Sequence, residues 1–554
     1  MKQRRGKNRR NLGSVIDEQA LSEVRAVLGD MPRQRDLLIE YLHRIQDQYK
    51  HISKRHIRAL AGELKLSQTE VYEVATFYHH FDVIDEATQA PPPELTVRVC
   101  ESLTCEMFKC RELIAELQAK FGDTVRIQPV PCVGRCHDAP VAMVGTNPVA
   151  RATVVEVEAA VREGRLEIAP QEYTDYDQYR ESGGYELLQR CVNGEYQREA
   201  VIKLLQDANL RGLGGAGFPA GKKWEILASK PKPRLIAINI DEGEPGTFKD
   251  RYYLERDPHR FIEGTLIASW AIESEDIYLY LRDEYAGCRR ILQAELEKLR
   301  QDPPCPLPPI HLRRGAGAYI CGEESAMIES IEGKRGMPRL RPPFVADVGV
   351  FGRPTLEQNM ETMHWIRDII EKGPEWFASQ GRHGRKGFRS FSVSGRVNKP
   401  GVHLAPAGIT IRELIDEYCG GMLPGHEFYG YFPGGASGGI LPASLDDIPL
   451  DFDTLQPYGT FIGSAAIIVL SKHDSARAMA LNAMAFFRDE SCGQCTPCRV
   501  GTEKAIDLMR EEKWDAGLLE ELATAMQDAS ICGLGQAAPN PLRCAIKYFP
   551  EEFS

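Results

Sequence analysis

Hydrophobic side chains recur with a helical period near the start of the chain. Residues 38–49 place apolar side chains at relative positions i, i+4, i+7 and i+11, which is one stripe of an amphipathic helix. A second helix is expected at 54–64. Ser67, followed three residues later by Glu70, has the capping-box pattern that opens a third helix. This part of the chain is therefore predicted to be helical.

The period changes to that of strands after a proline-rich stretch. Apolar and polar residues alternate at 95–99, a helical pattern follows at 111–121, and a second strand is expected at 124–128. Elements of these lengths predict a small α/β domain that ends near residue 168. The polar segment 170–189 is rich in Tyr, Asp and Gly and is expected to be a connector.

The second half of the chain carries two further strand patterns. From about 190 to 370, glycine-rich loops lie between apolar strands such as 235–240 and 277–281, which is typical of a nucleotide-binding α/β domain. From 390 to 470, short strands alternate with Gly/Pro turns around one expected helix at 410–419, a β-grasp-like pattern. The last part of the chain is predicted to be helical.

The composition predicts several separate cores and no affinity for polyanions. The chain has 554 residues, 43% of them hydrophobic, and a net charge of −11, which argues against nucleic acid as a partner. Lys and Arg cluster in the first ten residues, where either a solvated tail or a segment that docks on an acidic partner protein is expected. Because no apolar run has the length of a signal sequence or a membrane span, we expect a cytoplasmic protein without direct membrane insertion.

Eight of the fifteen cysteines fall into two spaced sets. The first set is Cys100-x4-Cys105 followed by Cys132-x3-Cys136, and each pair lies where a predicted strand ends. Four thiolates on loops that point backbone N–H groups at sulfur suit a [2Fe–2S] cluster. A four-cysteine zinc site is the alternative, although zinc sites more often use two similar pairs.

The second set places three cysteines on one short loop. Cys492, Cys495 and Cys498 are separated by two residues each, and Cys532 follows on a distant glycine-rich segment. A [4Fe–4S] cluster takes three ligands from such a loop and the fourth from elsewhere. Cys532 is preferred to Cys544 as the fourth ligand because neighbouring glycines let the backbone approach a cluster closely. The other cysteines are expected to be small buried hydrophobic residues.

Glycine-rich loops supply candidate phosphate and flavin contacts. The loop 211–224 has five glycines in its first eleven residues, with Lys223 as a counter-charge, although it lacks the Rossmann and Walker A patterns. A second loop, 315–325, contains paired acids, and 239–251 packs polar residues directly after a strand. Such loops beside two cluster sites indicate electron transfer between a hydride donor and one-electron centres, for which a flavin is the natural converter.

Taken together, these motifs resemble the NADH-oxidising end of respiratory complex I. Residues 30–165 are similar to its [2Fe–2S] subunit, and residues 190–550 are similar to its flavoprotein subunit. A fusion of the two resembles the diaphorase subunits of soluble NAD-linked enzymes. The run from Asp241 to His259 is more similar to the β subunit of molybdenum- or tungsten-containing NAD-dependent formate dehydrogenase than to the diaphorase subunit of NAD-reducing [NiFe] hydrogenase. A fused NADH dehydrogenase arm of complex I is a further alternative.

This resemblance implies a multidomain α/β and α+β fold. The implied cofactors are FMN, NAD(H), a [2Fe–2S] cluster and a [4Fe–4S] cluster. The expected parts are a basic tail at 1–20, an N-terminal helical domain at 21–87, a thioredoxin-like [2Fe–2S] domain at 95–168, a Rossmann-like FMN/NAD-binding domain at 190–375, a β-grasp domain at 388–472 and a C-terminal helical bundle with the [4Fe–4S] cluster at 473–554.

The resemblance also implies the cofactor-binding residues. Glu244 would hold the nicotinamide against the flavin ring and is the implied catalytic residue, while Phe218 and Phe344 would stack on the adenine side. Tyr319 and Glu324 complete the implied nicotinamide site. The implied flavin site comprises Gly212, Gly214, Gly215, Lys223, Asn239, Asp241, Glu242, Gly322, Glu323, Asn359 and Thr362.

Two positions depart from the family pattern. Leu213 stands where the family usually has Arg, and Gln358-Asn359 stands where the family usually has an Asn-Asn pair. Because Gln keeps the amide, Gln358 is retained as a cofactor-binding residue. The missing Arg charge is expected to weaken a phosphate contact or to tune affinity.

The implied function is that of one subunit in a hetero-oligomer. Hydride would pass between NAD(H) and FMN, and single electrons would pass through the clusters. The sequence has no recognisable molybdopterin-binding segment, so formate oxidation would need a catalytic partner that carries molybdopterin, or [NiFe] in the hydrogenase alternative, and further Fe–S clusters. A pure electron-transfer or assembly protein and a zinc-binding interaction module are the rival interpretations.

Overall fold

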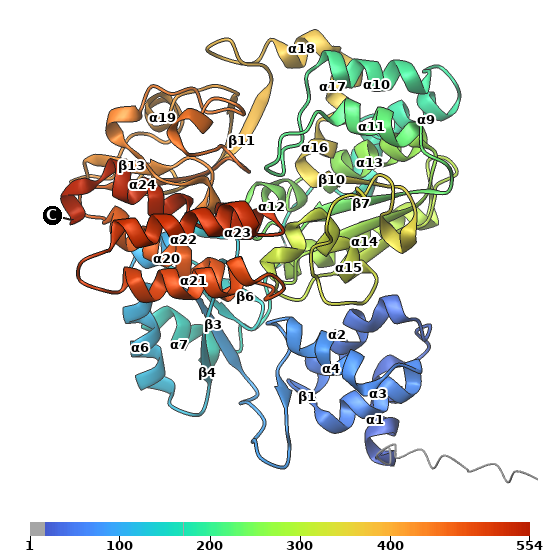
Figure 1. The fold of residues 1–554 in the computed structure, drawn as a ribbon. Helices are drawn as coiled ribbons and strands as arrows, with labels where there is room; N and C mark the ends of the chain where they lie inside the picture. The colour runs from blue at the N-terminus through green and yellow to red at the C-terminus, as the bar shows by residue number, and fades with distance from the viewer. Residues whose placement is uncertain (1–16, 170, 554) are drawn as a thin grey trace, which may run out of the picture. The chain divides into compact units, whose positions relative to one another are not determined.

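The computed structural model describes residues 17–169 and 171–553 (Figure 1). Its contacts divide the chain into two compact units, Met1–Pro92 and Pro93–Ser554, and the division falls within the proline-rich stretch. The basic cluster of the expected tail lies outside the described residues, whereas the last three residues of the tail, 18–20, begin the first helix and Asp17 caps it.

The N-terminal unit is helical, as its hydrophobic period predicts. Its elements are α1 (Glu18–Leu28), η1 (Arg35–Leu37), α2 (Leu38–Tyr49), β1 (Ile52–Ser53), α3 (Lys54–Leu64), α4 (Gln68–Phe77) and β2 (Val83–Ile84). Leu38, Leu42 and Ile45 of α2 are fully buried, so the apolar stripe faces the core. Ser67 Oγ accepts the Glu70 N–H at 3.1 Å and the Glu70 carboxylate accepts the Ser67 N–H at 3.1 Å, which confirms the capping box.

The first sheet of the C-terminal unit carries the first cysteine set. Its elements are β3 (Thr96–Cys100), α5 (Leu103–Met107), α6 (Cys110–Phe121), β4 (Arg126–Val130), η2 (Cys136–Asp138), β5 (Ala142–Val144), β6 (Asn147–Val149) and α7 (Val154–Arg162). The strand order is β4-β3-β5-β6, with β3 and β4 parallel and the other neighbours antiparallel. Val97, Leu117 and Val157 meet in the core between this sheet and its helices. The expected strands and helix of this part lie within two residues of their predicted bounds.

The second sheet of the C-terminal unit is parallel and has the strand order β10-β7-β8-β9. Its strands are β7 (Arg234–Ile240), β8 (Ser274–Leu281), β9 (Ile310–Arg314) and β10 (Thr355–Asn359). The accompanying helices are α8 (Tyr176–Glu181), α9 (Glu186–Val192), α10 (Arg198–Asp207), α11 (Ala220–Ala228), α12 (Lys249–Leu254), α13 (Pro258–Ile272), α14 (Ala286–Gln301), η3 (Tyr319–Gly322), α15 (Glu324–Ile331), η4 (Val350–Gly352), α16 (Met360–His364), α17 (Ile366–Lys372) and α18 (Pro374–Ala378). In Figure 1, α10, α11 and α13 lie above this sheet and α14 and α15 lie below it.

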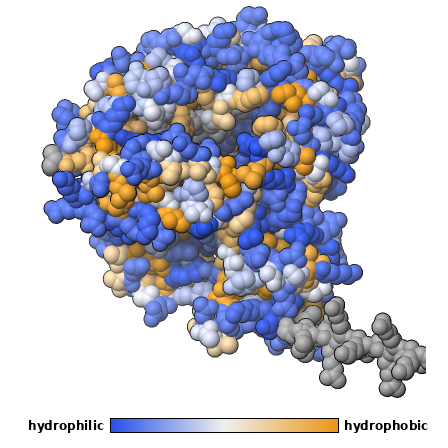
Figure 2. Space-filling view, viewed as in Figure 1, coloured by the Kyte–Doolittle hydropathy of each residue, from blue (hydrophilic) through white to orange (hydrophobic). Residues whose placement is uncertain are grey.

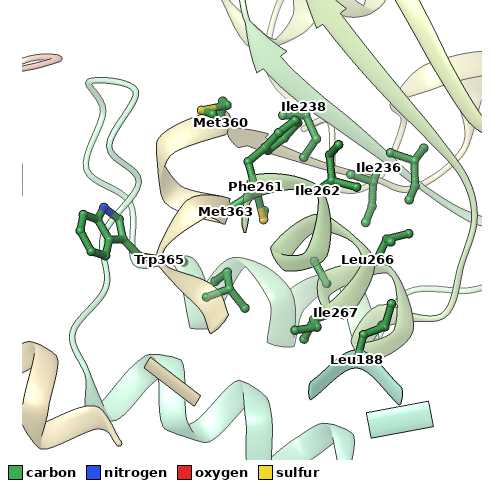
Figure 3. Packing of buried hydrophobic residues seen from close by; sticks show 14 of the residues in the cluster. Leu188, Ile236, Ile238, Phe261, Ile262, Leu266, Ile267, Met360, Met363 and Trp365 are labelled. Carbon is green, nitrogen blue, oxygen red and sulfur yellow. The ribbon is translucent and has the colours of Figure 1, made fainter. Parts of the chain in front are cut away.

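Helix α13 is almost entirely buried in this core, with thirteen of its fifteen residues buried. Figure 3 shows its side chains, Phe261 to Ile267, packed between Ile236 and Ile238 of β7 and Met360 and Met363 of α16. Because the strands are parallel, their carboxyl ends meet at one edge, where open α/β sheets bind ligands. The packing of α13 therefore joins β7 to α16, which directly follows the carboxyl end of β10.

The segment 170–189, expected to be a connector, contributes to the same core. It forms α8 and most of α9, and Tyr176, Tyr179 and Tyr185 are buried. Tyr179 donates its hydroxyl hydrogen to the carboxylate of Glu263 at 2.6 Å. Tyrosine can bury its ring when its hydroxyl finds a partner, so the polar composition of this segment concealed a packed aromatic cluster.

The third sheet matches the expected β-grasp-like pattern of short strands around one helix. Its order is β12-β11-β15-β13-β14, with β11 and β15 parallel. The expected helix at 410–419 is a single α-helical turn that continues as a π-helix, and Thr410 and Glu413 form its capping box. The elements are β11 (Phe388–Gly395), β12 (Gly401–Pro406), α19 (Ile411–Glu413), η5 (Leu414–Tyr418), β13 (Phe428–Phe432), η6 (Ala436–Gly438), β14 (Leu441–Pro442), η7 (Ala443–Leu445), η8 (Gln456–Tyr458) and β15 (Ala466–Ser471).

The last part of the chain is helical, as expected. Its elements are α20 (Ala476–Asp489), α21 (Thr496–Met509), α22 (Ala516–Ala529), α23 (Gly533–Ala537), α24 (Asn540–Tyr548) and η9 (Pro550–Phe553). Within the part of the chain that the structure describes, no helix combines the length and apolarity needed to span a bilayer. Figure 2 shows mostly hydrophilic residues on the viewed face, with small hydrophobic groups between them.

Removal of the Ile267 side chain tests the importance of the α13 core. Ile267 is fully buried, so Ile267→Ala should lower the free energy of unfolding by about 2–5 kcal/mol through lost burial and a residual cavity. The measurement is the urea midpoint followed by tryptophan fluorescence. Leu340→Ala, at a side chain that is 69% exposed, is the control. Equal midpoints for the two variants would contradict the assignment of Ile267 to the core.

Candidate functional site

The first cysteine set converges at one end of the β4-β3-β5-β6 sheet. Cys100 ends β3, Cys105 lies in α5, and the loop after β4 carries Cys132 and Cys136, whose Sγ atoms are 3.3 Å apart. All four side chains are buried free thiols. Hydrogen bonds from Cys100 and Cys136 hold the pKa of the Cys132 thiol well below its ordinary value. The structure thus brings together all four predicted ligands of this set.

The second cysteine set lies where α21 and α23 begin. Cys492 and Cys495 precede α21, Cys498 lies in its first turn, and Cys532 directly precedes α23. Burial, together with the nearby charge of Cys492, raises the pKa of Cys532 to about 12, although backbone N–H groups of its own loop act in the opposite direction. A Cβ built on Gly535 would lie 2.9 Å from Cβ of Cys498, so only glycine allows α23 to pack this closely.

Cys544 lies apart from this set. Its thiol contacts the carbonyl oxygen of Gly459 at 3.8 Å, in the segment that follows η8. The geometry therefore favours Cys532 as the fourth member. The remaining cysteines behave as the sequence predicts, because all are buried except the half-buried Cys305.

A cavity of about 430 Å³ opens at the carboxyl edge of the parallel sheet. Asn239 is the penultimate residue of β7 and Asn359 ends β10, and both line the cavity. A Cβ built on Gly214 would lie 3.0 Å from Cβ of Asn359, so the first glycine-rich loop closes over the strand ends. The predicted residues that line the cavity are Gly214, Gly215, Asn239, Asp241, Glu242, Glu244, Tyr319, Gly322, Glu323 and Asn359.

Other predicted residues support this cavity from outside its lining. Thr362 Oγ1 accepts the Leu213 N–H at 2.9 Å, and Gly212 N–H donates to the Phe218 carbonyl oxygen at 2.8 Å, which closes the glycine-rich loop. Gln358 is buried on β10, next to Asn359. The Leu213–Thr362 hydrogen bond thus holds the glycine-rich loop to α16, which directly follows β10.

Lys223 is paired with acids in this structure. Its ammonium donates to the carboxylate of Glu357 at 2.8 Å and lies 3.9 Å from Glu324. Burial opposes the charge, but the two carboxylates raise the pKa of Lys223 above its ordinary value. Glu324 therefore lies beside a predicted flavin contact. Phe218 and Phe344, expected to stack on adenine, are 46% and 54% exposed and do not line the cavity.

Two buried polar atoms near the strand ends lack partners among the described residues. They are Oδ2 of Asp241, which lines the cavity, and Nε2 of Gln358. Buried polar groups are normally hydrogen-bonded, so such atoms indicate where a ligand supplies the partner. Burial raises the pKa of Asp241 well above its ordinary value.

Glu244 is held by two elements that lie far apart in the sequence. Its Oε1 accepts hydrogen bonds from Ser437 N–H at 2.8 Å and Ser437 Oγ at 3.0 Å, and its Oε2 accepts one from the Tyr319 hydroxyl. Burial raises the pKa of Glu244 to about 7, although these hydrogen bonds act in the opposite direction. The carboxylate is therefore fixed in position and titrates near neutral pH.

The cavity and the second cysteine set share one wall. Gly533, Leu534 and Ala537 of α23, the helix that begins directly after Cys532, line the cavity. On another side, the Tyr319 N–H donates at 2.8 Å to Glu490, two residues before Cys492. A group bound in the cavity would thus lie against the segments that carry the thiols.

Several lining residues were not predicted. Lys249 and Asp250 form a buried ion pair at 2.8 Å, and Lys249 also contacts Glu361 at 3.1 Å. Lys249 and Asp250 could have been predicted from the sequence because they lie in the same polar run as Glu244. Ser437, Phe461, Gly463 and Ser464 come from the β-grasp sheet region, and no local pattern linked them to the glycine-rich loops.

Family comparisons match four successive regions. Residues 24–165 match the thioredoxin-like [2Fe-2S] ferredoxin model and residues 205–368 the Nuo51 FMN-binding domain. Residues 390–441 match the SLBB domain, and residues 478–554 match the NADH-ubiquinone oxidoreductase-F iron-sulfur binding region. These matches, with the sheets described above, confirm the expected multidomain α/β and α+β fold class and the expected cofactors FMN, NAD(H), [2Fe–2S] and [4Fe–4S].

Curated relatives and solved structures extend this similarity. The mitochondrial NADH dehydrogenase [ubiquinone] flavoprotein 1 of Dictyostelium discoideum is 40% identical over 376 residues, which cover 64% of this chain and 78% of the relative. The mitochondrial NADH-ubiquinone oxidoreductase 51 kDa subunit of Neurospora crassa is 40% identical over 64% of this chain and 76% of the relative. A crystal structure of NAD⁺-reducing [NiFe]-hydrogenase in the H₂-reduced state has a similar chain, with a TM-score of 0.82 and 28% identity over 94% of this chain and 93% of that chain.

The residues present fit these cofactors. Each cysteine set supplies four free thiols, and backbone N–H groups lie close to Cys132 in the first set and Cys532 in the second, as an iron–sulfur cluster requires. The cavity offers a glycine cradle and the unpartnered Oδ2 of Asp241 to a flavin.

A matched pair of cysteine variants tests the second set. Cys532→Ser should lower the iron content by about four atoms per chain and abolish the [4Fe–4S] signal, because the cluster loses its fourth thiolate. Cys544→Ser should leave both unchanged. The measurements are iron and acid-labile sulfide content with electron paramagnetic resonance after reduction. The opposite pattern would assign the ligand to Cys544.

The raised pKa of Glu244 predicts a pH-dependent contribution to stability. The folded-state pKa of about 7 exceeds the ordinary value of 4.5, so the folded protein binds the proton more tightly and stability falls as pH rises between these values. Because a Gln side chain does not titrate in this range, Glu244→Gln should not lose stability in this way as pH rises. Its melting temperature relative to the unsubstituted protein should therefore increase from about pH 5 to about pH 8. A difference that stays constant with pH would contradict the raised pKa of Glu244.

Proposed function

We propose, from the premise that the chain belongs to the family of the NADH-ubiquinone oxidoreductase 51 kDa subunit, that it is the NAD-reducing diaphorase subunit of an NAD-dependent formate dehydrogenase. The observation that carries the diaphorase function is the shared wall between the cavity and the second cysteine set. A hydride acceptor in the cavity would lie against a one-electron centre.

In this proposal, the residues of the cavity bind and orient two cofactors. The flavin contacts are Gly212, Gly214, Gly215, Lys223, Asn239, Asp241, Glu242, Gly322, Glu323, Gln358, Asn359 and Thr362. FMN, when bound, supplies the exchange between hydride and single-electron chemistry. The glycines let backbone N–H groups approach a phosphate, and Lys223 supplies a positive charge near it.

Glu244 is the proposed catalytic residue because it would contact the nicotinamide. Ser437 and Tyr319 fix its carboxylate from opposite sides, so it can accept a hydrogen bond from a bound carboxamide without reorganising. No protein acid or base is needed for hydride transfer. Phe218, Tyr319, Glu324 and Phe344 complete the proposed nicotinamide site, and the two exposed phenylalanines would cover an adenine.

The proposed partner is a catalytic subunit that carries molybdopterin and further Fe–S clusters. The resemblance of the run from Asp241 to His259 to the formate dehydrogenase β subunit supports this choice. The second candidate is the diaphorase subunit of an NAD-reducing hydrogenase with a [NiFe] partner. The structural similarity of a chain of NAD⁺-reducing [NiFe]-hydrogenase to 94% of the present chain supports this second candidate.

An electron-acceptor assay tests the proposal. The purified chain with its cofactors should reduce ferricyanide or a viologen with NADH, and should form no NADH from formate and NAD⁺, because formate oxidation belongs to the partner. The same protein stripped of FMN is the control and should lose the NADH-dependent activity.

Two outcomes would contradict parts of this proposal. NADH formation from formate by the chain alone would remove the need for a partner. Nickel, rather than molybdopterin, in the complex that co-purifies with the chain would favour the hydrogenase candidate over formate dehydrogenase.

A further inference from the structure

The loop that carries Cys132 and Cys136 is held by residues outside its own sheet. Arg282, which directly follows β8, donates from Nη2 to the Cys132 carbonyl oxygen at 2.7 Å. Arg251 of α12 donates from Nε to the Gly134 carbonyl oxygen at 3.0 Å. Both arginines belong to the parallel-sheet region, so two buried guanidinium groups fix this cysteine loop against it.

Arg282 also binds a residue of the cavity wall. Its Nη1 donates to the carbonyl oxygen of Glu242, which lines the cavity. One guanidinium therefore connects the backbone of a cluster ligand with the backbone of the predicted flavin site. Tyr285 reinforces this connection, because its hydroxyl donates to the Glu242 carboxylate at 2.7 Å. A Cβ built on Gly134 would lie 2.6 Å from Cε1 of Tyr285, so the loop backbone packs directly on this ring.

The positive charge of Arg282 is buried beside Cys132. The Arg282 side chain is 5% exposed, and the nearest carboxylate, Glu284, accepts from Nε at 3.1 Å and is 29% exposed. Burial opposes the charge, but Glu284 and then Tyr285 hold the pKa of Arg282 well above its ordinary value. A charge in the protein interior acts more strongly on its neighbours than one in water, because the effective dielectric constant is lower.

We propose that Arg282 is a positioning residue that fixes the cysteine loop against the flavin cavity and raises the reduction potential of the [2Fe–2S] cluster. This inference rests on the proposed electron-transfer function. One-electron reduction of a cluster held by Cys132 would add one negative charge near the guanidinium, with the electron supplied by NADH oxidation through FMN. The attraction favours the reduced form.

The planar guanidinium suits this role better than an ammonium. Its separate N–H groups reach two carbonyl oxygens and one carboxylate in fixed directions, whereas Lys offers a single nitrogen. Arg282→Lys therefore retains the charge and gives up the simultaneous contacts. Arg282→Gln removes the charge.

Reduction potentials measured in the cofactor-loaded protein test the inference. The probe is a redox titration of the [2Fe–2S] signal by electron paramagnetic resonance. At a fixed ambient potential, Arg282→Gln should lower the ratio of reduced to oxidised cluster about tenfold, which is a fall of about 59 mV for a one-electron couple. Glu284→Gln, which removes the opposing carboxylate, should shift the ratio in the other direction. Arg282→Lys should lie nearer to the unsubstituted protein than to Arg282→Gln.

Arg290→Gln is the matched control. Arg290 also donates to a backbone carbonyl oxygen, that of Ile168, and to the carboxylate of Glu167, but it does not contact the cysteine loop. Its loss should leave the potential unchanged.

Each outcome decides for or against the proposal. An unchanged potential in Arg282→Gln, or a shift equal to that of Arg290→Gln, would overturn it, as would Arg282→Lys behaving like Arg282→Gln. If Arg282→Gln fails to hold its cluster, Glu284→Gln decides: an upward shift supports the role of Arg282 and no shift overturns it. If the unsubstituted protein does not reduce ferricyanide with NADH, the result would contradict the proposed function and not the role of Arg282.

Discussion

The close packing of Cys532–Ala537 is the constraint on which the rest of the functional site depends. This short segment must present a thiol to the second cysteine set on one side and line the cavity on the other. It can do so only because Gly535 leaves no side chain between α23 and Cys498, where a Cβ would come within 2.9 Å. A larger residue would move the thiol, the cavity wall or both.

Buried polar groups then set the orientation of the remaining parts. Glu244 receives hydrogen bonds from the β-grasp sheet region and from η3, and Glu490 receives the Tyr319 N–H. Each of these carboxyl groups is costly to bury without partners, so the hydrogen bonds also hold the segments together. The polar network that surrounds the cavity therefore contributes to tertiary structure as well as to ligand binding.

Much of the fold followed from the sequence because its local signals agreed with the tertiary structure. The helix at 54–64, the Ser67 capping box and the parallel strands between glycine-rich loops needed no information from distant residues. Segment 170–189 was mispredicted because its tyrosines bury their rings while they keep hydroxyl partners such as Glu263. Composition alone does not distinguish such a cluster from an exposed connector.

The site was predictable where motifs carry their own chemistry. Both cysteine sets were identified by spacing and both glycine-rich loops by composition, and residues from all of them come together in the structure. Ser437 and Arg282 were missed because each acts on a residue far away in the sequence, Glu244 in one case and Cys132 in the other. Single hydrogen bonds of this kind leave no periodicity or spacing to detect.

The central claim is that electrons from NADH pass from the cavity to the second cysteine set across their shared wall. An anaerobic titration of the cofactor-loaded chain with NADH, followed by low-temperature electron paramagnetic resonance, tests it most directly. The account predicts that NADH bleaches the flavin absorbance and produces the signal of a reduced [4Fe–4S] cluster. Flavin bleaching without any cluster signal, in a protein whose clusters dithionite does reduce, would contradict it.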